Sequence, residues 1–359
     1  MHVLSLKSLA SLVLSVTLGT LGGWVAHLLG APMPFLLGAF AVSAAVTLAD
    51  IRLLGIAPGM PMPFRNMFVA VIGVTIGGSF QAGMLSDPGQ LWLPALGVLV
   101  FVVLAQAVNY VIFRVLGGYD PATAFFSAMP GGLIEAIAMG ERAGGDLQTV
   151  SLQQFARIAL VITMLPFLFL IWTGQQVGSA AGMSLTSPGH EMATQDAFVL
   201  LFCAVVGLYG GRALRLPASI LVGPLILSAV AHYYGLTEAG PPPWAISTAQ
   251  IIVGAGLGAR FRGFQLARIG KAFLLALLSV TAMLLIDAGL VFLLLFFVDQ
   301  PFQVLLISFA PGGVTETALI ALSLNANPVY VTTLHVFRII VTVFMGAIGA
   351  RILSKRAQH

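Results

Sequence analysis

Long apolar runs that carry almost no charge dominate this chain. Hydrophobic residue types make up 59% of the sequence and charged residues only 8%, against roughly 25% charged in an ordinary soluble domain. A water-soluble fold of this size could not bury so much apolar surface, whereas a lipid bilayer acts as a solvent for it. The 40 glycines agree with this interpretation, because small residues let membrane helices approach closely. We therefore predict an all-α polytopic membrane protein.

One local motif occurs twice in the sequence. Residues 129–135 (MPGGLIE) align with residues 310–316 (APGGVTE) at an offset of 181. The same offset pairs Arg157 with Arg338, and an offset of 185 pairs Pro32 with Pro217. These matches predict two copies of one membrane unit, residues 8–176 and 196–354, joined by a polar external linker at 177–195.

Each predicted unit contains six apolar segments. In the first unit they are 8–29, 33–49, 64–82, 91–116, 121–143 and 150–173. In the second unit they are 196–213, 217–235, 244–261, 270–298, 302–324 and 328–353. Six membrane crossings per unit would make the two copies parallel, whereas five crossings would make them inverted.

The basic residues favour five crossings, because Lys and Arg are enriched in cytoplasmic loops. If every segment crosses, a cluster that includes Arg260, Arg262 and Lys271 falls outside the cell. If the fifth segment of each unit enters and leaves on one side, no Lys or Arg lies in an external loop. The external loops then carry the acids Asp87, Glu191, Asp196, Glu238 and Asp299. We therefore predict two inverted repeats in a bacterial inner (plasma) membrane, with both termini in the cytoplasm.

The fifth segments have the composition of a broken or re-entrant hairpin. Pro311-Gly312-Gly313 divides its segment into pieces of about 9 and 12 residues. At about 1.5 Å per residue, neither piece crosses a hydrocarbon core of about 30 Å. Each repeat is thus predicted to contain five transmembrane helices and one broken Pro-Gly-Gly hairpin.

A broken backbone at membrane depth is tolerated where it is buried in protein or lines a wet cavity. The N–H groups at the start of a helix also favour an anion, and arginine binds a carboxylate through a planar fork. The predicted substrate-binding residues are Pro130, Gly131, Gly132, Pro311, Gly312, Gly313, Thr315, Arg157 and Arg338. The alternatives are that the motif only turns a hairpin tip, and that each arginine is the fixed partner of a glutamate.

Three acids within apolar segments are predicted to carry H⁺ or Na⁺, since an intramembrane ionisable group is costly unless it is paired or hydrated and marks a functional site by default. They are Glu135, Glu316 and Asp287. The glutamates could instead cap the half-helices, and Asp287, whose repeat partner is Gln106, could form a local hydrogen bond. Further polar residues could line a path or bond to the backbone, namely Gln153, Gln154, His335, Ser127, Ser308 and Thr317.

The sequence argues against an enzyme with a metal or other cofactor. None of the six histidines has a neighbour at metal-ligand spacing, and there is neither an HExxH motif nor a P-loop. There is one cysteine, which excludes a disulfide and a cysteine-based metal site. A soluble domain that could bind nucleic acid is also missing.

The chain resembles the AbrB-duplication family of Gram-negative inner-membrane proteins over nearly its whole length. The two Pro-Gly-Gly-x-x-Glu motifs and the segments that end at Arg157 and Arg338 carry the resemblance. Members are often labelled ammonia monooxygenases, although the metal ligands of such an enzyme are missing here, and the family name is associated with gene regulation. The resemblance implies the architecture of an ion-coupled secondary transporter with inverted repeats and re-entrant hairpins.

Together these features predict a secondary transporter of a small, anionic organic solute that works by alternating access and is coupled to H⁺ or Na⁺. Its predicted partners are the lipid bilayer and the solute, with assembly into a homo-oligomer left open. The first alternative is a membrane-embedded sensor or regulator that affects gene expression without transport. A membrane oxidoreductase is the second alternative, and it would require bound metal.

Overall fold

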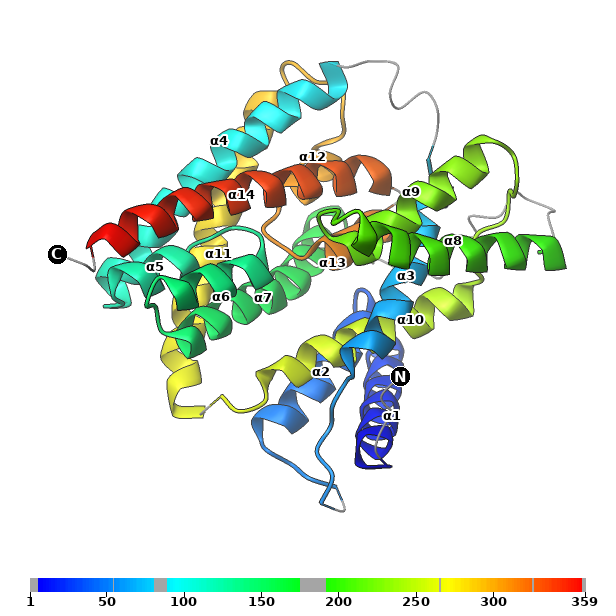
Figure 1. Ribbon diagram of the computed structural model, residues 1–359, viewed down its shortest axis with the longest axis horizontal. Coiled ribbons are helices and arrows are strands. Elements are labelled where there is room, and N and C mark those ends of the chain that lie inside the picture. The colour runs from blue at the N-terminus through cyan, green and yellow to red at the C-terminus, as the bar shows by residue number, and fades with distance from the viewer. Residues whose placement is uncertain are drawn as a thin grey trace. The chain divides into compact units, whose positions relative to one another are not determined.

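In the described parts of the chain, every element is helical and no β-strand occurs (Figure 1). The computed structural model describes residues 6–53, 55–80, 89–174, 192–264, 266–324 and 326–356. Asp87, Glu191 and most of the predicted linker (residues 177–191) lie outside these ranges. The predicted all-α class is confirmed for the residues described.

Fourteen α-helices and two short helical turns of other types make up these ranges. They are α1 (Leu6–Leu28), α2 (Pro34–Leu48), α3 (Met62–Gly78), α4 (Gly89–Val111), the π-helical turn η2 (Ile112–Leu116), α5 (Pro121–Ser127), α6 (Leu133–Arg142), α7 (Leu147–Thr173), α8 (Thr194–Ala213), α9 (Ser219–Tyr233), α10 (Pro243–Gly258), the 3₁₀ turn η4 (Ala259–Phe261), α11 (Leu266–Leu294), α12 (Phe302–Phe309), α13 (Val314–Ser323) and α14 (Pro328–Arg356).

Within the described residues, six helices are long and apolar enough to cross a membrane. They are α1, α4 with η2, α7, α8, α11 and α14. The helices α2, α3, α9 and α10 have 15, 17, 15 and 16 residues, which corresponds to about 22–26 Å at 1.5 Å per residue. The helices are those of a polytopic membrane protein, while the number of ten crossings stays a prediction.

Large apolar side chains on the outside of the structure give the same indication. Phe296 is 83% exposed, and Leu29 and Ile171 are each 79% exposed. Soluble monomers rarely expose large contiguous apolar patches, and hydrocarbon around these side chains removes the free-energy penalty of exposing them to water.

The helices form two compact units, and each unit draws on both halves of the sequence. Unit 1 comprises Met1–Met84, Leu165–Gly263 and Ala318–Val329, and contains α1, α2, α3, α8, α9 and α10. Unit 2 comprises Leu85–Met164, Phe264–Thr317 and Tyr330–His359, and contains α4, α5, α6, α11, α12, α14 and most of α7. The compact units therefore combine corresponding parts of the two predicted repeats, so neither unit is a single repeat.

Within unit 1, neighbouring helices cross at glycines that leave no room for a side chain. A Cβ on Gly38 in α2 would lie 2.2 Å from the carbonyl oxygen of Gly22 in α1. A Cβ on Gly223 in α9 would lie 2.0 Å from the carbonyl oxygen of Gly207 in α8. The second pair follows the first at the offset of 185 that the sequence repeat predicts.

Two further crossings in unit 1 join helices from different predicted repeats. A Cβ on Gly73 in α3 would lie 2.5 Å from the carbonyl oxygen of Leu221 in α9. A Cβ on Gly254 in α10 would lie 2.3 Å from the carbonyl oxygen of Leu36 in α2. The offset of 181 relates Gly73 to Gly254, and the offset of 185 relates Leu36 to Leu221. The two contacts are therefore equivalent, as expected if α2 and α9 occupy the same position in the two predicted repeats.

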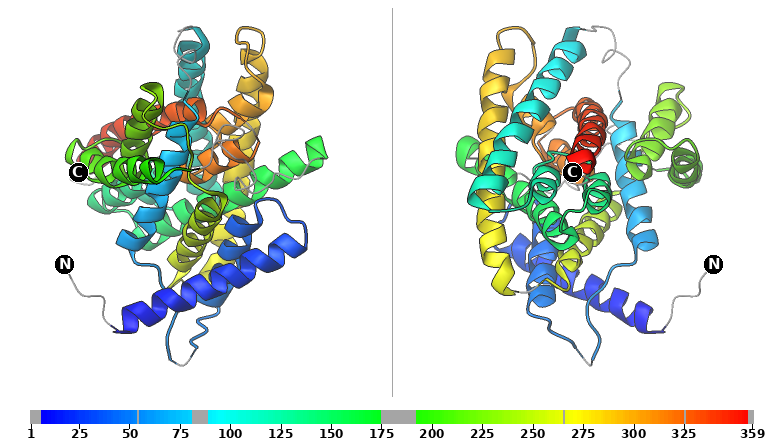
Figure 2. Two further views of the ribbon diagram at one scale, coloured as in Figure 1. Left: turned by 90° about the vertical axis from the view of Figure 1, so that its right-hand side faces the viewer. Right: turned by 60° about the vertical axis from the view of Figure 1, so that its left-hand side comes forward.

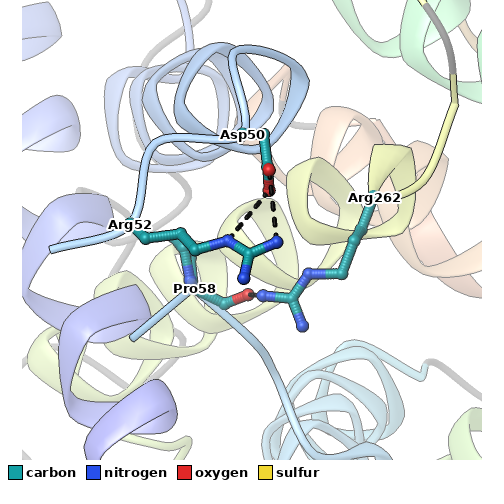
Figure 3. A network of polar contacts seen from close by, with 4 residues as sticks. All are labelled: Asp50, Arg52, Pro58 and Arg262. Carbon is teal, nitrogen blue, oxygen red and sulfur yellow. Dashed lines mark hydrogen bonds and ion pairs between the residues drawn. The ribbon is translucent and has the colours of Figure 1, made fainter. Parts of the chain in front are cut away.

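The loop between α2 and α3 is fastened to its surroundings by polar contacts. Arg262 donates to the carbonyl oxygen of Pro58, and the exposed Arg52 forms an ion pair with Asp50 at 3.2 Å (Figure 3). Ser15 in α1 accepts a hydrogen bond from the backbone N–H of Gly59 at 2.7 Å. Arg52 and Arg262 are among the basic residues whose distribution predicts that this end of unit 1 faces the cytoplasm.

In unit 2, α4 and α11 pack against each other, and Figure 2 shows them side by side. The helix α4 also contacts α5 and α12, and α11 contacts α12. These two long helices thus lie against the short helices that precede the Pro-Gly-Gly motifs.

The tight crossing of α8 and α9 predicts different effects for two glycines of one helix. In Gly207→Ala the new Cβ would lie 2.5 Å from the backbone of Pro224, and such overpacking costs about 1–3 kcal/mol. In Gly210→Ala the Cβ meets nothing within 4 Å, and the change should stabilise the helix by about 0.5–1 kcal/mol. Thermal unfolding of the purified variants measures both effects, and equal melting temperatures would contradict the packing described.

Candidate functional site

Both Pro-Gly-Gly motifs interrupt a helix. The helix α5 ends at Ser127 and α6 begins at Leu133, while α12 ends at Phe309 and α13 begins at Val314. Pro130, Gly131, Pro311 and Gly312 are buried within the two breaks. Gly132 has φ 61° and ψ 57°, a left-handed conformation that glycine adopts without steric strain. The motif thus sets where each helix stops and restarts.

In the first broken segment, α6 lies back along α5. The carboxylate of Asp120 caps α5 by accepting hydrogen bonds from the N–H groups of Ala122 and Thr123 at 3.0 and 2.9 Å. The backbone N–H of Asp146, which follows α6, donates to the hydroxyl of Thr123 at 2.7 Å. A Cβ on Gly140 of α6 would lie 3.1 Å from the Cβ of Phe126. The start of α5 and the end of α6 therefore lie at the same end of this segment.

Two side chains of α7 hold the carbonyl end of α5. The amide nitrogen of Gln154 donates to the carbonyl oxygens of Phe126, Ser127 and Met129 at 2.9, 3.3 and 3.2 Å. The guanidinium of Arg157 also donates to the carbonyl oxygen of Met129. The last carbonyls of a helix have no partner within the helix, so these donors satisfy them in the buried interior.

Two side chains of α14 do the same at the carbonyl end of α12. His335 lies 2.8 Å through Nε2 from the carbonyl oxygen of Ile307. The guanidinium of Arg338 donates to the carbonyl oxygens of Phe309 at 3.0 Å, of Ala310, and of Gly312 at 2.8 Å. A cation at the carbonyl end of a helix is also favoured by the helix dipole.

The contacts at the two breaks correspond residue by residue. The offset of 181 that aligns the motifs relates Gln154 to His335 and Arg157 to Arg338. It also relates their acceptors, Phe126 to Ile307 and Met129 to Ala310. Both arginines, which we predicted to bind substrate, thus use part of their donors to hold the broken backbone.

The two glutamates lie at the opposite side of each break, in the first turn of the second half-helix. A carboxylate oxygen of Glu135 lies 3.4 Å from where a Cβ on Gly132 would be, and the corresponding distance for Glu316 and Gly313 is 2.1 Å. An acid near a helix N-terminus is stabilised by the helix dipole, which agrees with the capping alternative. Glu135 is exposed, Glu316 is buried and Thr315 is half-buried.

Asp287 lies in α11 with 0% of its surface exposed. Neither of its carboxylate oxygens has a hydrogen-bond partner among the described residues, and the carboxylate interacts electrostatically with Arg338. Burying a charged group is costly unless the group is paired. This acid is therefore placed where its charge state affects the arginine that holds the second break.

Each break also approaches the helix that bears the other arginine. A Cβ on Gly131 would lie 3.2 Å from the hydroxyl oxygen of Thr342 and 3.7 Å from Nε of Arg338 in α14. A Cβ on Gly312 would lie 3.1 Å from Val161 in α7, one turn beyond Arg157. The structure thus brings the predicted Pro-Gly-Gly residues together with both arginines within unit 2.

Several buried polar atoms around the breaks have no hydrogen-bond partner within the described chain. They are Nε of Arg157 and of Arg338, Oε1 of Gln153 and of Gln154, Nδ1 of His335, the hydroxyl oxygens of Ser127 and Thr332, Oε1 of Gln106 and both side-chain polar atoms of Asn109. An unsatisfied buried polar group costs about 1–3 kcal/mol. Such a concentration of unsatisfied groups is the feature expected where a solute or water completes the hydrogen bonding.

The sequence analysis did not identify Asn109, Thr332 and Thr342. Asn109 lies one helical turn after Gln106, which donates to the carbonyl oxygen of Phe125 at 2.9 Å. That spacing was the available signal for Asn109, because polar residues three apart share a helix face.

Just before the start of α5, the hydroxyl of Tyr119 accepts a hydrogen bond from the side chain of Gln153 at 2.9 Å. Burial raises the pKa of this phenol.

Two other features of the described residues do not contribute to this site. An apolar hollow of about 600 Å³ in unit 1 is lined by residues of α8 and α9 such as Phe198, Phe202 and Leu227, and by Leu236. None of the residues predicted to bind solute or ions lines it. In the described part of the chain, no group of three or more His, Cys, Asp and Glu residues could hold a metal ion.

Comparison with known proteins places the chain in a family. A family model described as "Transition state regulatory protein AbrB" matches residues 51–354, which include both broken segments. The chain belongs to the AbrB family. It is 25% identical over 348 residues to the uncharacterized protein YhjN of Bacillus subtilis (strain 168), covering 91% of this chain and 89% of that protein.

A second AbrB relative comes from Escherichia coli (strain K12). It is 24% identical over 297 residues, covering 82% of this chain and 84% of that protein, and its name describes it as a proposed regulator, AbrB. Neither relative is named as an enzyme.

The contacts of Arg338 predict that lysine cannot replace it. In Arg338→Lys the charge stays, but the planar fork that reaches three carbonyl oxygens is lost. Carbonyls left without a donor cost about 1–3 kcal/mol each, so the melting temperature of the purified protein should fall. Arg52→Lys changes an exposed ion pair and should shift stability by less than about 1 kcal/mol. A wild-type melting temperature for Arg338→Lys would contradict the anchoring role.

Proposed function

We propose that this AbrB family protein is a secondary transporter of a small, anionic organic solute. The observation that carries the proposal is the cluster of buried, unsatisfied polar groups around two interrupted helices. Interrupted helices near the membrane midplane form the binding sites of many secondary transporters.

The charges around the breaks favour an anion. Arg157 and Arg338 are buried, and Asp287 is the buried carboxylate that interacts with Arg338. The other buried acid of this region, Glu316, lies at the N-terminal end of α13, where the helix dipole offsets its charge. The Nε atoms of both arginines have no partner among the described residues, so a carboxylate would meet an unused N–H and a favourable potential.

The topology that we propose for transport has two inverted repeats, 8–176 and 196–354, with their broken segments entering from opposite sides of a bacterial inner membrane. Three observations support it: the folded-back contacts of α5 and α6, the equivalent anchoring at both breaks, and the equivalent helix crossings of unit 1. Both termini would then lie in the cytoplasm, as the distribution of Lys and Arg favours. One bundle would move against the other to expose the site alternately.

A membrane sensor or regulator is the second candidate function. It is favoured by the name of the Escherichia coli relative, which describes a regulator. A sensor would bind the same anionic solute at the same groups but would not release it on the other side. Counterflow separates the two functions, because exchange of labelled against unlabelled solute requires alternate access from both sides.

Reconstituted protein should accumulate at least one small carboxylate from a panel of acetate, lactate, pyruvate and succinate when an ion gradient is imposed. Arg157→Gln should reduce this uptake by about tenfold or more. The reason is that a charge-assisted hydrogen bond contributes about 1.5–3 kcal/mol, and 1.4 kcal/mol corresponds to a tenfold change in affinity. Arg52→Gln, at an exposed ion pair, is the matched control and should transport like the wild type. Folded protein that shows neither uptake nor counterflow with any of these solutes would contradict the transporter.

A further inference from the structure

We propose that the coupling ion of this transporter is a proton carried by Asp287, and that Na⁺ has no binding site at the breaks. This inference rests on the proposed function and identifies the ion that the same site uses. At the offset of 181, α11 has Asp287 where α4 has Gln106, so at this position only the second predicted repeat has an acid.

Na⁺ would need oxygen ligands at the breaks. In transporters with broken helices, carbonyl oxygens at the unwound backbone and at half-helix C-terminal ends coordinate Na⁺. Here two arginines already donate to several of those oxygens. Arg338 donates to Phe309, Ala310 and Gly312, and Arg157 donates to Met129. A fixed guanidinium thus stands where a metal cation would bind, and its charge repels a second cation.

Gln106, the residue of α4 that corresponds to Asp287, forms a hydrogen bond with α5. Its amide nitrogen donates to the carbonyl oxygen of Phe125 in α5 at 2.9 Å. The equivalent acceptor in the other half is the carbonyl oxygen of Leu306 in α12, and α11 packs against α12 as α4 packs against α5. An ionised carboxylate can only accept hydrogen bonds, whereas a protonated one also donates. Asp287 can therefore reproduce the contact of Gln106 only after it takes up a proton.

Asp287 lies in surroundings that leave its carboxylate without a hydrogen-bond donor among the described residues. Its side chain is fully buried and both oxygens lack a hydrogen-bond partner in the described chain. From α14 it meets the charge of Arg338, next to which lies His335, and Arg338 in turn interacts with Arg157. Of the elements that pack on α11, α12 contains no ionisable residue, α4 contains only Tyr110, and η2 contains Arg114.

The protonation state of Asp287 therefore changes the force on Arg338. An ionised Asp287 attracts the guanidinium of Arg338, which competes with the carbonyl oxygens of the second break for the same donors. A protonated Asp287 removes that attraction and can itself donate to α12. Uptake and release of one proton would therefore shift the balance of forces on Arg338, the residue that anchors the break between α12 and α13.

Infrared difference spectroscopy of the purified full-length protein during a pH titration tests the proposal. The wild type should show a C=O band of a protonated carboxylic acid that appears on acidification. Because the other acids also give such bands, the wild-type spectrum should contain one component that Asp287→Asn lacks and that Asp299→Asn, whose acid is exposed, retains. A titration spectrum of Asp287→Asn that equals that of the wild type would overturn the proposal. Asp287→Asn should fold, because an amide is already accommodated at the equivalent Gln106.

A second measurement on the wild type does not depend on any variant. Melting temperatures in NaCl, KCl and choline chloride at equal ionic strength should be the same. Stabilisation by Na⁺ over K⁺ that disappears in Asp287→Asn would overturn the proposal. In proteoliposomes, carboxylate uptake driven by a Na⁺ gradient but not by a pH gradient would refute proton coupling while leaving the transporter intact. Proton uptake by Asp287 without any carboxylate flux would instead contradict transport.

Discussion

The structure depends on how two interrupted helices satisfy their carbonyl oxygens where water is scarce. An unsatisfied backbone group in a bilayer costs several kcal/mol, so broken helices persist only where other groups of the protein replace the missing bonds. Arg157 with Gln154, and Arg338 with His335, supply those donors from α7 and α14. The acids Glu135 and Glu316 lie at the N-terminal ends of the following half-helices. Each break thus has side-chain donors at its carbonyl end and an acid at its N–H end. The long helices α7 and α14, which carry the donors, hold the breaks in place.

This arrangement changes the part that the arginines play in solute binding. An arginine that only held substrate would leave its whole fork free, whereas Arg338 uses both terminal nitrogens on the backbone. The donors left over include the two Nε atoms and the hydroxyl of Ser127. A solute bound to these groups would be coupled directly to the geometry of the breaks. In the proposed transporter, the same side chains would recognise the anion and transmit its binding to the helices.

Much of this could be predicted from the sequence, because apolar runs, Pro-Gly-Gly and paired charges have direct physical consequences. The breaks lie at the predicted motifs, and the family suggested by those motifs is the one that the chain belongs to. The acceptors of Arg157 and Arg338 could not be predicted, since a motif does not show whether a guanidinium meets a carboxylate or a carbonyl. The division into two compact units that each combine parts of both predicted repeats was not predicted either. It rests on contacts such as Gly73 with Leu221, which link residues far apart in the sequence.

The central claim is that the two anchored breaks belong to inverted halves and enter the membrane from opposite sides. Labelling of single cysteines with a membrane-impermeant maleimide tests this directly, since the chain has one cysteine, the buried Cys203, which can be replaced by serine. The exposed Glu141 lies at the end of α6 and the exposed Asp299 lies just before α12. We expect Glu141→Cys to be labelled only from the cytoplasmic side and Asp299→Cys only from the external side. Labelling of both from the same side would contradict it.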